Sequence, residues 1–278
     1  MLGAGTQAEP FLVGNIPDFR EAVAQDNAYV KLTNDIDCNK ENYLEWQSLI
    51  SKCTEIDFDG HAIINPLIAT YNFMLDGNYK TMLRNGKILN IYENGANAII
   101  KSCALSNMAV SSHLVKTIDT AFQGIVADRC NFVTFNQDLN NKAWFSVAQS
   151  IAGINSFKNC RFRLDGNIDD DSVFDSWNSN TGNLVADGCL FEGKINVNYA
   201  TGGLPYVIYG GIINCVWAVD TLNNTGDTVR LAGSANNTNI YQYDISGLNN
   251  HLDAIPCNAE QIRNPDYLNS VGFTVVEV

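Results

Sequence analysis

The segments that decide the fold are Lys101-Ser102-Cys103-Ala104-Leu105, Asp128-Arg129-Cys130-Asn131-Phe132, Lys158-Asn159-Cys160-Arg161-Phe162, Asp187-Gly188-Cys189-Leu190-Phe191 and Ile213-Asn214-Cys215-Val216-Trp217. Each has a cysteine after a polar or turn residue, then one variable residue, then a large apolar side chain. The sequence numbers of successive cysteines differ by 27, 30, 29 and 26. A repeat of this length that contains several short strands indicates the coils of a β-solenoid.

Two upstream segments have glycine where the other five have cysteine. They are Asp59-Gly60-His61-Ala62-Ile63 and Asn85-Gly86-Lys87-Ile88-Leu89, and the numbers of their glycines again differ by 26. The numbers of Gly86 and Cys103 differ by only 17. Either one coil is shorter than the others or the register changes at this point.

Short apolar runs follow the cysteines and are bounded by Gly, Asn and Asp, which is typical of short β-strands. Equivalent residues of stacked parallel coils lie about 4.8 Å apart. The cysteines therefore predict one inward column, and the Phe, Leu or Trp two residues later predicts a second. The predicted fold class is all-β, a right-handed parallel β-helix with short capping helices at both ends. A β-sandwich would not require this signature at a near-constant step.

The chain has eight cysteines, for which three roles come into question. Disulfides would need bonding between neighbouring coils, but β-carbons in a column point in parallel. A metal site is disfavoured because no Cys-x-x-Cys or Cys-x-x-His pair occurs. Packing in the core is favoured, and free stacked thiols favour synthesis in a reducing compartment.

Both ends of the chain have the features of caps, which a solenoid needs because an end coil exposes its core. Residues 16–24 predict an amphipathic helix with Phe19 and Val23 on one face, and residues 29–38 predict a first strand. Residues 258–265 predict a second short helix, before Tyr267-Leu268 and an apolar run at 271–275 that closes the last coil. The predicted organisation is one domain, 1–278, with an N-terminal cap (1–28), coils (29–256) and a C-terminal cap (257–278).

Composition narrows the classes of partner. Only 17% of the 278 residues are charged, 46% are hydrophobic, and the net charge is −13. Without a basic stripe, nucleic acid and anionic membrane surfaces are not expected as partners. No apolar run approaches the roughly 20 residues of a membrane span, so membrane insertion is not expected. The start of the chain lacks a signal-peptide pattern, so we expect synthesis in a cytoplasm, unless the chain leaves by another route or is trimmed.

The opening Gly3-Ala-Gly5-Thr6-Gln-Ala-Glu-Pro10-Phe11-Leu-Val13 resembles the start of many β-helical repeat proteins of bacteria and their phages. In those proteins a short helix and a strand of the form Tyr-x-x-Leu-x-x-Asp-Ile follow, as Phe19 and residues 29–36 do here. The tail from Ile262 to Phe273 is similar to the usual end of such domains. The resemblance implies the pectin-lyase-like β-helix, which hosts lyases, glycoside hydrolases, adhesins and phage spikes.

Two acidic groups are candidate sites of chemistry. Asp169, Asp170 and Asp171, with Asp165 and Asp175 nearby, are the only dense acidic run, and such a run would suit Ca²⁺ in a polysaccharide lyase. No basic residue follows closely after Arg163, so a solvated loop is favoured. Glu55, Asp57 and Asp59 share one strand face in this interpretation, and a glycosidase needs two such acids about 5 to 10 Å apart. A surface role is favoured for them too.

Other motifs carry little chemistry. His61, His113 and His251 are isolated, and no Gly-x-Ser-x-Gly elbow occurs. Gly3-x-Gly5 is interpreted as a turn rather than a phosphate loop. Among Trp46, Trp144, Trp177 and Trp217, the last belongs to the inward column and Trp177 is the best candidate for an exposed aromatic. Asn223 and Asn236 are glycosylation signals only in a eukaryotic secretory route. No catalytic residue, metal ligand or cofactor is predicted, and binding residues are not assigned.

The expected function is therefore a structural or adhesive component of a bacteriophage particle, such as a fibre, spike or head appendage, located in the virion and without catalytic activity. Its expected partners are other virion proteins and a host surface glycan, and phage β-helices favour a homotrimer. The alternatives are a bacterial surface carbohydrate-binding module and a polysaccharide lyase or glycoside hydrolase on a β-helix.

Overall fold

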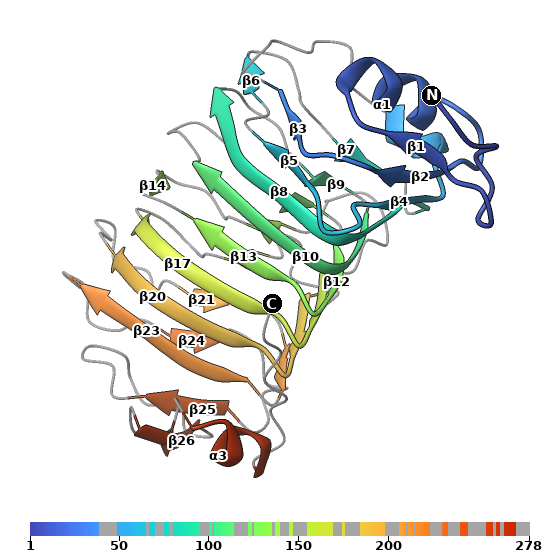
Figure 1. Cartoon of the computed structure of the whole chain (residues 1–278). Helices are drawn as coiled ribbons and strands as arrows, with labels where there is room; N and C mark the ends of the chain where they lie inside the picture. Colours follow the sequence, from blue (N-terminus) through green and yellow to red (C-terminus); the bar gives the residue numbers. More distant parts are fainter. Residues whose placement is uncertain are drawn as a thin grey trace.

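The structure is a computed structural model of the whole chain (Figure 1). It describes residues 1–38, 49–64, 67–69, 75–77, 80–94, 100–101, 103–113, 122–123, 125–134, 137–139, 145–146, 155–168, 174–175, 184–197, 206–208, 211–213, 215–222, 230–232, 240–243, 254–257, 260–261 and 264–270.

The described residues are mostly β-structure, arranged in one long sheet and one shorter sheet behind it (Figure 1). The long sheet contains β1 (Phe11–Val13), β2 (Tyr29–Leu32), β3 (Ile36–Asp37), β4 (Glu55–Asp57), β5 (Ala62–Ile64), β6 (Leu67–Ala69), β8 (Met82–Asn94), β10 (Ala104–His113), β12 (Val126–Asp128), β13 (Asn131–Thr134), β14 (Gln137–Leu139), β16 (Asn155–Lys158), β17 (Arg161–Ile168), β19 (Leu184–Asp187), β20 (Leu190–Val197), β22 (Gly211–Ile213), β23 (Val216–Leu222), β25 (Ile240–Tyr243) and β26 (Ala254–Cys257). The shorter sheet contains β7 (Leu75–Asp76), β9 (Ile100–Lys101), β11 (Phe122–Gln123), β15 (Phe145–Ser146), β18 (Phe174–Asp175), β21 (Tyr206–Ile208) and β24 (Arg230–Ala232). The helices are α1 (Ile16–Val23), the 3-10 turn η1 (Leu49–Lys52) and α3 (Pro265–Ser270).

The strands of both sheets pair in parallel, each with a strand one repeat further along the chain. Val110 pairs with Phe132, Phe132 with Phe162, Phe162 with Phe191, and Phe191 with Trp217. The chain therefore returns to the same place in the sheet once in every coil of this part of the stack. The described residues confirm the predicted predominance of β-structure and the parallel pairing of strands. The arrangement is compatible with a solenoid.

The cysteine column is confirmed for Cys130, Cys160, Cys189 and Cys215, all of them buried. The Cys189 N–H donates to Cys215 Sγ at 3.4 Å, which places these two residues one above the other. The prediction was wrong for Cys103. Ser106 pairs with Asp128 and Ala109 with Asn131, so Met108 is level with Cys130.

Cys103 lies instead in a different buried row, which the chain enters shortly before it reaches Met108. Ala104 pairs with Met82 and with Val126, so Cys103 is level with Thr81 and Ile125. For the same reason Leu105 is not in the column of Phe132: it pairs with Leu83 and Ala127. The short step from Gly86 to Cys103 therefore has two causes: methionine replaces cysteine in the column, and the steps from Gly86 to Met108 and from Met108 to Cys130 are 22 residues each, shorter than the 26 to 30 of the later coils.

Gly86 occupies the predicted column position, but Gly60 does not. A Cβ on Gly86 would lie 2.1 Å from the Phe58 Cβ and 2.5 Å from the His61 carbonyl oxygen. The fully buried Phe58 side chain therefore occupies the interior position of its coil that the sequence pattern assigned to Gly60. Gly60 has φ +85 and a Cβ there would meet nothing within 4 Å, so this glycine serves the turn.

The second inward column is a stack of aromatic rings. Phe132 and Phe162 have ring centroids 5.1 Å apart with planes at 10°, and Phe162 and Phe191 are 4.9 Å apart at 7°. Phe157, from the row of Ala127 and Ala186, meets the ring of Phe162 edge-on, at 5.1 Å and 84°. Small residues on either side of Phe157 leave room for this ring. Offset and edge-on ring pairs of this kind each add about 0.5–1.5 kcal/mol to the burial term.

Helix α1 lies at the β1 end of the stack, as the sequence predicts for a cap (Figure 1). The Asn15 side chain accepts a hydrogen bond from the Asp18 N–H and caps the helix, and a proline occupies its first turn. Phe19 and Val23 are each 1% exposed, so the shared apolar face is confirmed. Beyond β1, the Leu12 N–H donates to the Leu2 carbonyl at 2.8 Å, which satisfies a donor on this edge strand.

The C-terminal end is more helical than predicted. Residues 260–261, within the predicted helix at 258–265, are helical, and a further helix, α3 (Pro265–Ser270), includes Tyr267 and Leu268, for which no helix was predicted. The side-chain oxygen of Asn264 accepts hydrogen bonds from the N–H groups of Asp266 and Tyr267, with Pro265 at the first helical position. An Asn-Pro start is a strong helix signal that the sequence interpretation placed at a helix end. Residues 271–278 lie outside the described part.

Candidate functional site

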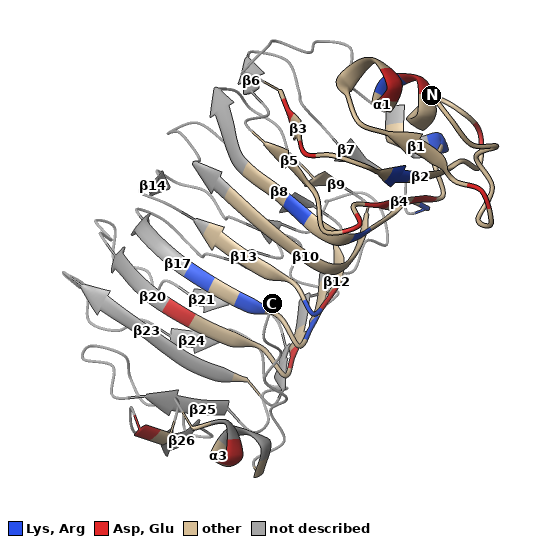
Figure 2. Cartoon of the chain, viewed as in Figure 1, with Lys and Arg blue, Asp and Glu red and all other residues tan. Residues whose placement is uncertain are grey.

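One outer face of the long sheet carries most of the described charged side chains that line up between coils. It is formed by β2, β4, β8, β10, β12, β16 and β19. One outward-facing residue of each strand is in register with its counterparts on the neighbouring strands, and we call these residues the charged row. They are Lys31, Asp57, Arg84, Ser106, Asp128, Lys158 and Asp187. Figure 2 shows acidic and basic segments following one another along this side of the stack.

A second outward row runs beside the charged row, two residues earlier on each strand. Its members in mutual register are Tyr29, Glu55, Met82, Ala104, Val126 and Ser156. We call Met82, Ala104 and Val126 the apolar row. Met82 is 37% exposed and Val126 is 52% exposed, so two large apolar side chains face outward over β8 and β12.

At the β4 end of this face, Arg84 joins two carboxylates. Its Nη2 lies 2.9 Å from Glu55 Oε1 and 2.9 Å from Asp57 Oδ2. Asp57 Oδ1 also accepts hydrogen bonds from the side-chain amide of Asn85 at 3.2 Å and from the Asp59 N–H at 3.0 Å. These contacts use both oxygens of Asp57, so the arrangement holds the strand end in place.

The predicted acidic group is therefore divided by the structure. Glu55 and Asp57 lie on one strand face as predicted, but Asp59 does not. Strand β4 ends at Asp57, and Asp59 sits in the turn beyond it with φ 48. Its Oδ2 lies 2.9 Å from Lys31 Nζ. The acids that a glycosidase would need are thus paired with bases of the neighbouring coils.

A corner follows the charged row, where the chain bends between two strands of each coil. The residue at the corner has positive φ in successive coils: 58° at Asn85, 54° at Asn107, 54° at Arg129, 54° at Asn159 and 63° at Gly188. Asparagine and glycine tolerate this left-handed conformation best, which explains their recurrence before the column position. Arginine is the exception among them.

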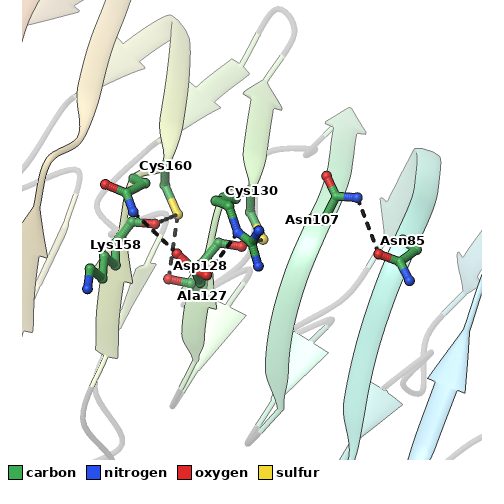
Figure 3. A network of polar contacts seen from close by, with 9 residues as sticks. Asn85, Asn107, Ala127, Asp128, Cys130, Lys158 and Cys160 are labelled. Atoms are coloured by element: carbon green, nitrogen blue, oxygen red, sulfur yellow. Dashed lines mark hydrogen bonds and ion pairs between the residues drawn. The ribbon is translucent and has the colours of Figure 1, made fainter. Parts of the chain in front are cut away.

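The corner asparagines also bond across coils. Figure 3 shows the Asn107 amide donating to the Asn85 side-chain oxygen, a distance of 3.3 Å. Asn159 donates in the same way to Asp128 Oδ1 at 3.5 Å. This ladder of side-chain hydrogen bonds fixes the turn of one coil on the turn of the next.

Directly inside the corner lies the thiol column. The Cys160 thiol donates to the carbonyl oxygens of Lys158 at 3.3 Å and Ala127 at 3.6 Å, and the Cys130 thiol to that of Asp128 at 3.3 Å (Figure 3). These weak bonds give carbonyls beside the bend an additional donor, since the Lys158 carbonyl also accepts the Arg129 N–H at 2.9 Å. The thiols therefore serve the turn as well as the core.

Seven cysteines are free and buried in the described part of the chain: Cys38, Cys53, Cys103, Cys130, Cys160, Cys189 and Cys215. The predicted core role is confirmed for these seven. Burial raises the pKa of Cys53 to about 12 and is the first cause of the raised pKa of Cys189. The hydrogen bond with Cys160, followed by burial, raises the pKa of Cys130. The raised pKa keeps the thiols of Cys53, Cys130 and Cys189 protonated, and protonated, enclosed thiols are poor nucleophiles.

The remaining predicted motifs lie apart from one another. His61 Nδ1 is 3.4 Å from Asp35 Oδ1, and His113 is the last residue of β10. Gly3 and Gly5 have φ of 99° and 72°, and a Cβ on either would meet Pro10 or Phe11 at 2.4 Å or less. Their interpretation as a turn is confirmed.

Several predicted positions lie outside the described residues: Trp46, Trp144, Asp169, Asp170, Asp171, Trp177, Asn223, Asn236 and His251. Asp165 lies in β17, Asp175 in β18 and Trp217 in β23, level with Phe191. Within the described residues no group of three or more His, Cys, Asp or Glu side chains could hold a metal ion. The described helices include none that is long and apolar enough to span a membrane.

The sequence interpretation missed both outward rows. The signal was present, because a charged residue stands two positions before four of the repeated cysteines or their equivalents, as Asp128, Lys158 and Asp187 show. Their alternation in charge becomes visible only when the coils are aligned through Met108. No protein-family model matches the chain, and no curated protein matches it either.

Proposed function

We propose that the chain is a right-handed parallel β-helix of the pectin-lyase-like type, which serves as a rigid structural or adhesive component of a bacteriophage particle. The observation that carries this proposal is the parallel, in-register return of the chain from β1 to β26, built around free buried thiols. Parallel strands joined by crossovers are right-handed in about 98% of cases, which supports the handedness.

The internal packing supports assembly in a reducing cytoplasm. The described coils are held by stacked Phe rings, thiols and corner amides rather than by cross-links. Disulfides form and persist in oxidising compartments, whereas buried free thiols suit a protein that matures in a host cytoplasm. This fits a virion protein released together with the particle.

The outer surface supports a contact role. A stack of coils repeats its outward side chains about every 4.8 Å, which creates an extended ladder of hydrogen-bonding groups. Along the corner this ladder consists of amides such as Asn85 and Asn107, which can donate to and accept from sugar hydroxyls. A host surface glycan and the other virion proteins are the proposed partners, and the virion is the proposed location.

The test is mass spectrometry of purified virions of the phage that encodes this chain, followed by immunogold labelling of intact particles. We expect the chain at a stoichiometric level and label at the capsid surface or the tail. Absence of the chain from purified virions, with its presence in the infected-cell lysate, would overturn the proposal.

Two alternative functions, a bacterial carbohydrate-binding module and a polysaccharide-degrading enzyme, can be distinguished from the proposed function by simple assays. A bacterial carbohydrate-binding module would bind host envelope glycan but be absent from virions. A lyase or glycoside hydrolase would release reducing ends or unsaturated products from host polysaccharide. We expect no release, because Arg84 already engages Glu55 and Asp57.

A further inference from the structure

The charged row has a symmetry that ordinary surface does not need. Counted from Ser106, the first neighbours are Arg84 and Asp128, the second are Asp57 and Lys158, and the third are Lys31 and Asp187. At each step one side is basic and the other acidic. Reversing the direction of the row therefore exchanges every base for an acid.

This pattern is what a two-fold contact between identical chains requires, because residue i of one copy meets residue j of the other and the reverse. We infer that the charged row and the apolar row together form a self-complementary surface that binds a second copy of this chain with its coils stacked in the opposite direction. The two-fold axis runs along β10, through the level of Ala104 and Ser106.

The apolar row occupies the centre of the proposed contact. Rotation about this axis places Met82 opposite Val126 of the second copy, and Ala104 opposite itself. Both large side chains are exposed in the single chain, at 37% and 52%. The pairing would bury them together. The charged row would lie opposite charges of the other sign, which extend the ion pairs that Arg84 and Lys31 already make within the chain.

The other in-plane axis is unfavourable. A two-fold axis parallel to the stacking direction would place each coil opposite the same coil of the second copy. The charged row of one copy would then face the second outward row of the other. Glu55 would then face Asp57 of the second copy, and Val126 would face Asp128. Like charges and desolvated carboxylates would meet, so only the reversed arrangement satisfies the pattern.

Charge balance also distinguishes this face from the rest of the chain. It carries three bases (Lys31, Arg84 and Lys158) and four acids (Glu55, Asp57, Asp128 and Asp187), a net charge of −1. The whole chain carries −13, so two copies repel each other elsewhere. The contact is therefore directed to this face.

The contact is expected to be weak. Six steps of about 4.8 Å give the charged row a length of roughly 29 Å, and the two rows together are about 10 Å wide. The area of about 300 Å² per copy is below the roughly 800 Å² of a standard interface, so the pair should form in a concentration-dependent way. The inference does not depend on the role proposed for the particle.

Light scattering coupled to size exclusion on the full chain tests the pair. We expect the mass to rise from 30.5 kDa toward twice that value with concentration. Val126→Asp should weaken association about tenfold or more, because it introduces an unpaired charge at two symmetric positions. Leu2→Asp is the matched control, an apolar residue 73% exposed at the N-terminal end, and should leave association unchanged.

Cross-linking tests the direction of the two chains. Ser106→Cys should give a covalent dimer with a short bis-maleimide, and Lys87→Cys, exposed on β8 beyond the corner, should not. Met82→Cys mixed with Val126→Cys should cross-link more efficiently than either variant alone. A monomer or trimer at every concentration, association unaffected by Val126→Asp, or equal cross-linking of Met82→Cys alone would overturn the inference.

Discussion

Gly86 lies directly against Phe58 in the neighbouring coil, so closely that a Cβ on Gly86 would be 2.1 Å from the Phe58 Cβ. We expect Gly86→Ala to lower the free energy of unfolding by about 1–3 kcal/mol, because the overpacked side chain forces a backbone shift. Urea denaturation measures this loss. Gly60→Ala is the control for steric conflict, because a Cβ there meets nothing and only the cost of positive φ remains.

The same contact can be tested by coupling. Phe58→Ala alone should cost about 3–5 kcal/mol, as for other buried aromatic residues. In the double variant with Gly86→Ala, the Phe58 Cβ at 2.1 Å and the His61 carbonyl oxygen at 2.5 Å remain, but the new methyl group no longer meets the ring carbon at 2.8 Å, so part of the steric conflict is relieved. The two losses should therefore sum to more than the loss in the double variant, and strict additivity would contradict the proposed packing.

Phe162 is the middle ring of the aromatic stack and touches Phe132, Phe157 and Phe191. Phe162→Ala should lower the free energy of unfolding by about 3–5 kcal/mol, since the removed ring leaves a cavity between two coils. Lys158→Ala, on the exposed side of the same coil, should change it by less than about 0.5 kcal/mol. Equal effects of the two substitutions in urea denaturation would argue against the ring stack.

The buried thiol of Cys53 should make the folded chain less stable at alkaline pH. Its thiol donates to the Ala28 carbonyl at 3.1 Å, and burial raises its pKa from 9.0 to about 12. Above pH 9 the unfolded chain releases this proton while the folded chain keeps it, so the stability is full below pH 9 and is lost as the pH rises toward about 12. The slope is about 1.4 kcal/mol per pH unit for one thiol.

The matched measurement compares urea denaturation of the wild-type chain and Cys53→Ala between about pH 8 and 11, which covers the pH at which the thiol titrates in the unfolded chain. Tyrosine and lysine titrate in both proteins, so the difference between the two slopes isolates this thiol. The wild-type chain should lose stability more steeply, and identical slopes would show that the Cys53 thiol is not enclosed.

Arg129 is the only arginine among the described corner residues with positive φ, where neighbouring coils have Asn107 and Asn159. Its pair with Asp128 is between half-exposed side chains and contributes little. Arg129→Asn should therefore raise the free energy of unfolding by about 0.5–1 kcal/mol, because asparagine adopts this conformation at lower cost. The reciprocal change, Asn107→Arg, should lower the free energy of unfolding. If thermal unfolding showed that Arg129→Asn destabilises the chain or that Asn107→Arg stabilises it, arginine would not be strained at the corner.

The sequence alone determined the repeat, the all-β class and two of the inward columns. Cys130, Cys160, Cys189 and Cys215 recur at a step that only stacked coils explain, and the Phe residues two positions later follow the alternation of side chains in a strand. Helix α1 was predictable as well, because Asn15, Pro17 and the spacing of Phe19 and Val23 are local signals.

The tertiary structure decided the register. Methionine and cysteine are both apolar, so the sequence could not show that Met108, rather than Cys103, is level with Cys130; only the hydrogen bonds between β10 and β12 establish it. Gly60 was misplaced for a different reason: the coil of Phe58 has two more residues in its turn than the coil of Gly86, and the sequence does not show where they are inserted. The charged row joins residues from seven coils, and their order in space depends on that register alone.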